Sequence, residues 1–142
     1  MISRTLLIAA RPFGARLDAG RVAGAIAEGL RDCGWEVDML ALDDESESAA
    51  IALVRSPEFE ARMRAARAVV IAEPQLDERT LAGTVAFEIA TRARQGGVPA
   101  YAVTGEDDLD SFDARILDLQ TILQARTHRS LVNAGRKLAA IV

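Results

Sequence analysis

Acidic side chains gather in three segments of this sequence, each of which follows an apolar run. The first segment, 43–48, reads DDESES, the second, 73–77, reads EPQLD, and the third, 106–110, reads EDDLD. Carboxylates that converge on one place can hold Mg²⁺ beside a phosphorylated ligand, or they can supply a general base. Loops are also polar because they are solvated, so each segment has this simpler interpretation as well.

These segments belong to a regular alternation of expected strands and helices. A continuous apolar run is typical of a strand buried on both faces, whereas apolar residues three or four positions apart mark the buried side of a helix. These patterns predict strands at 5–10, 35–42, 69–72, 98–104 and 115–119, and helices at 19–33, 49–65 (broken at Ser56-Pro57), 77–95 and 120–142. We therefore expect one α/β domain over residues 1–142. It is a three-layer, Rossmann-like or flavodoxin-like parallel sheet of about five strands with helices on both faces.

A parallel sheet of this kind places every loop that follows a strand at one rim. Ligands bind at that rim, where the strand order reverses. Glu73 and Asp77 stand between a buried strand and a helix start, although Asp77 has an alternative role as a helix cap. Arg11 and Arg16 flank the first rim loop and are candidate anion contacts near a helix N-terminus; solvated surface arginines are the competing interpretation.

Composition and missing motifs exclude several classes of function. The net charge of −4 gives no general attraction to nucleic acid or to an anionic membrane, and no apolar stretch approaches the roughly 20 residues of a membrane span. The chain has 1 cysteine, which favours a reducing, cytoplasmic location. Neither GxGxxG after the first strand nor GxxxxGK[ST] is present, and the only histidine, His128, has no metal-binding or catalytic partner in the pattern.

Several longer segments, taken together, match a known set of loops. IAARPFGARLDA (8–19) is similar to IAPDSFKGSLSA, AEPQLDERTLAGT (72–84) to GEGRLDxQTLxGK, and GVPAYAVTG (97–105) to GVPVIALAG. These are segments of the bacterial glycerate kinase family, which phosphorylates D-glycerate with ATP. The resemblance covers about 5–48 and 66–142, and it lacks the family's large middle portion. It implies Mg²⁺ and ATP as cofactors.

The resemblance also transfers site residues to this chain, position by position. It implies a ligand or metal rim at the matching residues Asp44, Glu47, Glu73, Asp77 and Thr80. The cations do not match in the same way. Gly14 and Thr84 stand where the family has lysines, and Gln75 stands where it has an arginine. Pro74 replaces a glycine, which fixes φ and removes a backbone donor.

The lost cations bear directly on phosphoryl transfer. Catalysis of that reaction rests on positioning and on stabilising negative charge, and one arginine can be worth about 10³–10⁵ in rate. We therefore expect a diverged family member without kinase activity of its own, which keeps a small-molecule or Mg²⁺ site at the rim.

Two other hypotheses remain open from the sequence. One is a phosphotransferase for glycerate or another small hydroxy acid that a partner chain or a homodimer completes, with Arg11, Arg16 or Arg79 in place of the lost cations. The other is an unrelated Rossmann-like binding or assembly module that shares only the layout.

Overall fold

The computed structural model describes residues 3–43 and 46–142, which contain one five-stranded parallel sheet. The strands are β1 (Thr5–Ala10), β2 (Glu36–Ala41), β3 (Ala68–Leu76), β4 (Ala100–Asp107) and β5 (Leu119–Gln124). Their order is β2-β1-β3-β4-β5, and every neighbouring pair is parallel. The predicted α/β fold class is confirmed.

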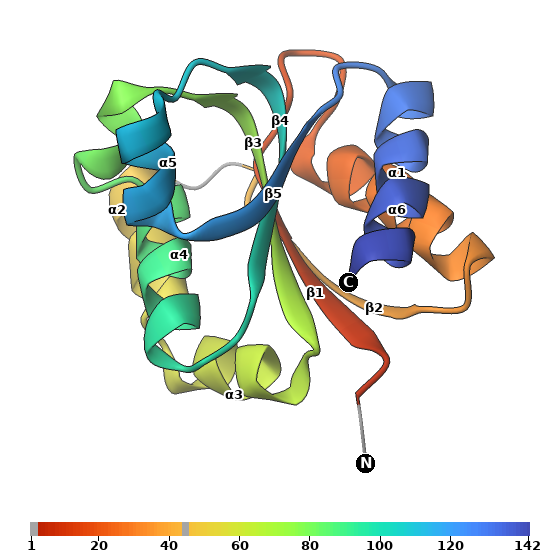
Figure 1. Cartoon of the computed structure of the whole chain (residues 1–142), viewed down its shortest axis with the longest axis horizontal. Coiled ribbons are helices and arrows are strands. Elements are labelled where there is room, and N and C mark those ends of the chain that lie inside the picture. Colours follow the sequence, from red (N-terminus) through yellow and green to blue (C-terminus); the bar gives the residue numbers. More distant parts are fainter. Residues whose placement is uncertain (1–2, 44–45) are drawn as a thin grey trace.

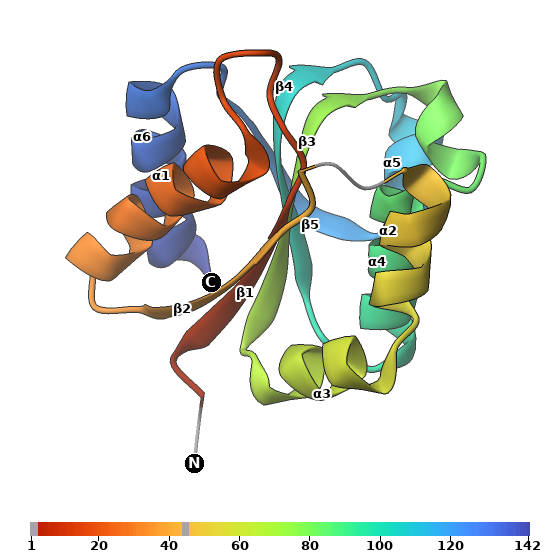
Figure 2. The ribbon, with the colours of Figure 1, turned by 180° about the vertical axis from the view of Figure 1, so that it is seen from behind.

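Helices cover both faces of the sheet (Figures 1 and 2). One face carries α1 (Ala19–Asp32) and α6 (His128–Ile141), and the other carries α2 (Glu47–Val54), α3 (Pro57–Ala65), α4 (Val85–Gln95) and α5 (Ser111–Leu117). Alternate residues of the central strands feed the two cores: Val70 packs with the α1/α6 side, and Val69 with the other. No helix within the described ranges is long and apolar enough to cross a membrane.

Strand β3 is longer than the sequence pattern predicted, and the expected loop at 73–77 is mostly strand. β3 pairs with β1 only as far as Ala72, but it continues beside β4 with Gln75 opposite Glu106 and Leu76 opposite Asp107. Among the described residues, nothing pairs with the β1 side of β3 beyond Ala72. Pro74 is tolerated there because a strand with a free edge does not need every N–H.

The expected helix at 77–95 is also wrong in its first part. Glu78–Leu81 is a 3₁₀ turn, and α4 begins only at Val85 behind the N-cap Thr84. Gly83 separates the two with a φ of 86°, a conformation that glycine adopts without strain.

The C-terminal part of the prediction needs a similar correction. The expected strand at 115–119 lies mostly in α5, which Asp110 caps, and β5 lies just after it. The last helix starts at His128 rather than near 120, with Thr127 as its N-cap. The expected break at Ser56-Pro57 is confirmed, since Ser56 caps α3 and Pro57 takes its first position.

Candidate functional site

The strand order reverses between β1 and β3, so the carboxyl ends of these two strands form the expected binding edge. Arg11 directly follows β1 there, and its backbone N–H donates to the carbonyl of Ala72 over 3.0 Å. Glu73 is the next residue of β3. The structure thus brings a cation from the first rim loop beside an acid from the third.

Arg11, Glu47 and Glu73 form what we call the switch-point cluster. Arg11 Nη1 donates to the carbonyl of Leu42 over 3.2 Å, and its Nη2 lies 3.6 Å from Glu47 Oε1. The Arg11 side chain is only 16% exposed, whereas that of Glu47 is 50% exposed. Two of the acids predicted from sequence, Glu47 and Glu73, therefore do lie near one another with a predicted arginine.

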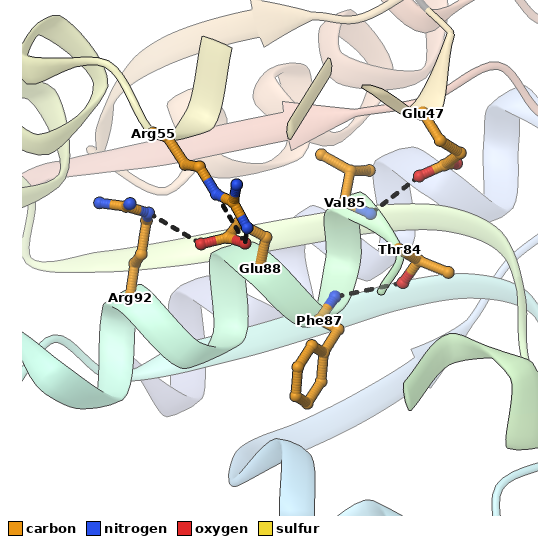
Figure 3. A network of polar contacts seen from close by, with 7 residues as sticks. All are labelled: Glu47, Arg55, Thr84, Val85, Phe87, Glu88 and Arg92. Atoms are coloured by element: carbon orange, nitrogen blue, oxygen red, sulfur yellow. Dashed lines mark hydrogen bonds and ion pairs between the residues drawn. The ribbon is translucent and has the colours of Figure 1, made fainter. Parts of the chain in front are cut away.

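The second oxygen of Glu47 is bound to a helix end. Glu47 Oε2 accepts a hydrogen bond of 2.9 Å from the backbone N–H of Val85, the first residue of α4 (Figure 3). Helix N-termini attract anions because their first N–H groups lack partners within the helix. The carboxylate of Glu47 therefore takes the place at α4 that an external anion would otherwise use.

Glu73 has the most perturbed acid group among the described residues. Burial, the largest cause, and the negative charge of Glu47 together raise its pKa to about 8, against the opposing positive charge of Arg11. At neutral pH this carboxyl group is mostly protonated, so it can donate a hydrogen bond as well as accept one. Buried acids with shifted pKa values occur often at functional sites.

Asp77 and Thr80 have a structural role that the geometry makes plain. Asp77 Oδ1 accepts from the N–H of Arg79 over 2.9 Å, and the N–H of Asp77 donates to Thr80 Oγ1 over 3.0 Å. This capping box holds the 3₁₀ turn. The hydrogen bond from the Arg79 side chain to Asp77 lowers the pKa of that carboxyl group.

The remaining predicted residues do not join the switch-point cluster in the described structure. Arg16 is exposed, and its carbonyl accepts a hydrogen bond of 3.4 Å from Arg21 Nη1. No hydrogen bond or ion pair between described residues joins the Arg16 side chain to the cluster. Asp44 lies outside the described residues.

A groove at the same rim escaped the sequence analysis. It has a volume of about 420 Å³, and we call it the rim groove; its lining residues are Phe13, Pro74, Gln75, Gly105, Glu106 and Arg126. Val70 and Ala72 of β3 belong to the α1/α6 core, so the alternation of the strand directs Pro74 to that side and Glu73 to the other. The groove and the switch-point cluster therefore lie on opposite sides of β3.

Close backbone packing shapes this groove. A Cβ on Gly105 would lie 2.7 Å from the carbonyl oxygen of Pro74, so only glycine lets β3 and β4 approach here. Arg126 Nε donates to the carbonyl of Gly105 over 2.7 Å, and Arg126 Nη2 lies 3.4 Å from Glu106 Oε1. Arg126 follows β5, which the sequence pattern misplaced, and for that reason the pattern did not point to it.

The described residues do not fit the Mg²⁺ and ATP that the resemblance implies. Over 3–43 and 46–142, no group of three or more His, Cys, Asp or Glu side chains could hold a metal ion. At the start of α4 the N–H of Val85 is bound by Glu47 and that of Phe87 by Thr84, which leaves neither for a phosphate (Figure 3).

The fold and rim define a doubly wound α/β domain of the flavodoxin-like type, with strand order 2-1-3-4-5. A model of the glycerate kinase family matches residues 38–139, and the chain therefore belongs to the glycerate kinase family. The match includes β3, the rim groove residues Pro74 to Arg126 and most of α6, whereas the segment 8–30 lies before it. This excludes the hypothesis of an unrelated module.

Solved structures agree on the fold alone, because their sequence identities are low. An oxidoreductase from Corynebacterium diphtheriae has a TM-score of 0.57 at 10% identity, with 100% of this chain and 98% of that chain covered. A de novo designed Rossmann 2x3 protein has a TM-score of 0.55 at 8% identity, with 99% of this chain and 91% of the designed chain covered. A flavodoxin-like domain from Synechococcus sp. has a TM-score of 0.50 at 21% identity, with 96% of each chain covered. No curated protein matches the sequence.

Proposed function

We propose that this member of the glycerate kinase family binds a small polar molecule in the rim groove and does not transfer phosphoryl groups by itself. The observation that carries the proposal is the groove itself, which opens at the carboxyl ends of β3 and β4. Its volume of about 420 Å³ falls within the range of small-molecule sites.

The walls of the groove suit a hydroxy acid, the class of substrate that the family phosphorylates. Arg126 offers its remaining N–H donors to a carboxylate. Its Nε is fixed by Gly105 and its Nη2 lies 3.4 Å from Glu106 Oε1, while the side chain remains 66% exposed. Gln75 offers an amide to hydroxyl groups, and Phe13 and Pro74 give an apolar wall. An apolar wall beside a small number of polar groups is typical of specific small-molecule sites.

We expect no independent kinase activity because two arginines at the rim, Arg11 and Arg79, already contact acidic side chains. Arg11 contacts Glu47 and the carbonyl of Leu42, and Arg79 contacts Asp77. Both arginines were candidates to replace a lost lysine, and both are already neutralised by an acid. Pro74 adds a fixed φ and no N–H at a place where the family has glycine.

Ligand titration tests the binding half of the proposal. D-glycerate, lactate, ATP, ADP and Mg²⁺ are titrated separately against the purified chain, with calorimetry and thermal unfolding as readouts. A hydroxy acid at 100 times its Kd should stabilise the fold by about 2.7 kcal/mol. Arg126→Gln should abolish this response. Arg129→Gln, which removes an exposed arginine that does not line the groove, should preserve it. A response that survives Arg126→Gln, or no response to any hydroxy acid, contradicts the proposal.

A phosphotransfer assay tests the other half. ATP consumption is measured with D-glycerate and Mg²⁺ over a hundredfold range of protein concentration. We expect ATP consumption with D-glycerate to be no higher than ATP consumption in its absence. Glycerate-dependent turnover would overturn this part of the proposal. Turnover that rises more steeply than the protein concentration would favour an enzyme completed by a homodimer.

A further inference from the structure

We propose that the rim groove prefers a ligand that carries an ammonium group as well as a carboxylate, and that its ligand class is a small hydroxy amino acid. Serine is the simplest member of that class, and it differs from glycerate only in having an ammonium group in place of the 2-hydroxyl group. This inference rests on the function proposed above, since it narrows the class of ligand that the same groove would take. Glu106 is the residue that sets the preference.

The charged lining of the groove consists of one base and one acid. Among the described lining residues, only Arg126 and Glu106 carry charge, and their nearest atoms, Nη2 and Oε1, lie 3.4 Å apart. A ligand that has only a carboxylate can pair with Arg126, but it then lies beside the like charge of Glu106. A ligand with both charges can pair with both residues, so the groove is complementary to it.

Arg126 is held in place to receive the carboxylate. Its Nε donates to the carbonyl of Gly105 over 2.7 Å, which anchors the guanidinium group at the end of β4. Its Nη1 has no hydrogen-bond partner in residues 3–43 and 46–142. The N–H groups on that nitrogen are therefore available to a carboxylate, whose geometry matches the guanidinium fork.

Glu106 is less constrained and can turn to an ammonium group. Its carboxylate contacts only Arg126 in the described part of the chain, and its side chain is 51% exposed. Ion pairs of this exposure contribute little free energy, so a ligand can replace Arg126 as the partner. When a ligand carboxylate takes Arg126, Glu106 needs another cation, and the ammonium group of the same ligand supplies it.

Gln75 offers a second acceptor beside Glu106. The two residues are register partners in the pairing of β3 with β4, which makes their side chains neighbours. Gln75 Nε2 donates to Asp108 Oδ2 over 3.4 Å, whereas its Oε1 has no hydrogen-bond partner among the residues described. An ammonium group donates three hydrogen bonds and accepts none, so it suits a carboxylate with a neighbouring amide oxygen.

The neighbouring charges favour a cation at this end of the groove. Asp107 and Asp108 directly follow Glu106, and both are exposed. Asp107 Oδ1 accepts a backbone hydrogen bond of 3.3 Å from Leu109, and no base within the described ranges forms an ion pair with it. These acids stand in a row near one arginine, so their field opposes a ligand with a net negative charge. A zwitterion has no net charge and avoids this cost.

Matched ligand titrations test the preference. Serine and glycerate, each as both enantiomers, are titrated at neutral pH and constant ionic strength against the wild type, Glu106→Gln and Glu60→Gln, with calorimetry as the readout. Glu60 lies on α3 and does not line the groove, so Glu60→Gln controls for net charge. We expect the wild type and Glu60→Gln to bind serine about tenfold or more tightly than glycerate, because like charges placed side by side are penalised. In Glu106→Gln the preference should disappear, with no loss of glycerate affinity.

Two results would overturn the proposal. One is a glycerate affinity that equals or exceeds the serine affinity in the wild type, and the other is a serine preference that survives in Glu106→Gln. Circular dichroism verifies folding, and Glu106→Ala takes the place of Glu106→Gln if that variant does not fold. Both results leave the groove as a binding site, because glycerate still binds. Binding of neither ligand would overturn this inference and the proposed function together, so the two failures are distinguishable.

Discussion

Gly29 of α1 and Gly135 of α6 face each other where the two helices cross, so closely that the helix backbones touch. A Cβ on Gly29 would lie 3.1 Å from the Cα of Gly135 and 2.8 Å from the backbone N of Arg136, and it would overlap the carbonyl oxygen of Val132. A Cβ on Gly135 would overlap the carbonyl oxygen of Ile26 in turn. Glycine normally weakens a helix by about 1 kcal/mol relative to alanine, and here close packing of the two helices offsets that cost.

Alanine at either glycine should therefore destabilise the protein. We expect Gly29→Ala and Gly135→Ala each to lower the free energy of unfolding by about 1–3 kcal/mol, the usual cost of overpacking. Gly24→Ala is the matched control on α1, because a Cβ at that position would meet nothing within 4 Å. It should raise stability by about 0.5–1 kcal/mol. Urea unfolding of the three variants measures this, and a stable Gly135→Ala would show that the helices can separate without cost.

The raised pKa of Glu73 predicts a specific dependence of stability on pH. The folded state keeps its proton up to about pH 8, whereas the unfolded chain loses it near 4.5. The folded state thus binds more protons between these values, so this group's contribution to stability falls as pH rises from about 4.5 to 8. Glu73→Gln, which stays neutral, should match the wild type at pH 5 and exceed it at pH 9 by up to a few kcal/mol. Parallel urea-unfolding profiles for the two proteins would contradict the shift.

Glu88 should contribute measurably to stability because it joins α2 to α4. It is 17% exposed and is bound by Arg55, the C-cap residue of α2, and by Arg92 of its own helix. We expect Glu88→Ala to cost about 1–2 kcal/mol, whereas Glu60→Ala, which breaks the exposed Arg64 pair, should cost at most about 0.5 kcal/mol. The lowered pKa of Glu88 means that its contribution is lost as pH falls through the acidic range. Thermal unfolding at pH 7 and pH 4 tests both statements.

Asp77 is predicted to act as a cap rather than as a ligand contact. Asp77→Ala should lower stability by about 1 kcal/mol, as for other lost N-caps. Asp77→Asn keeps an acceptor for the N–H of Arg79 and should lose less. Neither variant should change hydroxy-acid titrations. Altered ligand affinity in a fully folded Asp77→Asn would return this residue to the binding site.

The sequence predicted the core strands well and the rim poorly, for a physical reason. TLLIAA at 5–10 is a continuous apolar run, so β1 as a strand buried on both faces follows from apolar content alone. Pro74 reads locally as a loop signal, but whether a strand tolerates proline depends on which neighbour it still pairs with. The boundary between helix α5 and strand β5, within 115–124, was also not predictable locally, because the two elements have similar apolar content.

The candidate site shows the same limit. Glu47 and Glu73 were identifiable as acids at the carboxyl edge of the sheet, and their closeness followed from the parallel topology. The contacts of Glu47 with the N–H of Val85 and with Arg11 could not be predicted, because they depend on where α2 and α4 begin. Arg126 had no local signature at all, since its importance comes only from contact with the distant Gly105.

The pairing of α1 with α6 also bears on how the chain folds. Asp32 and Arg136, 104 residues apart, form a 3.0 Å contact between these helices, whereas the opposite face is covered by helices that lie between successive strands. Contacts so distant in sequence are slow to form, because a long loop must close first. During synthesis the apolar face beneath α6 stays uncovered until residues 128–141 have emerged from the ribosome. We expect aggregation to be most favourable during that interval, because transiently exposed apolar surface promotes it.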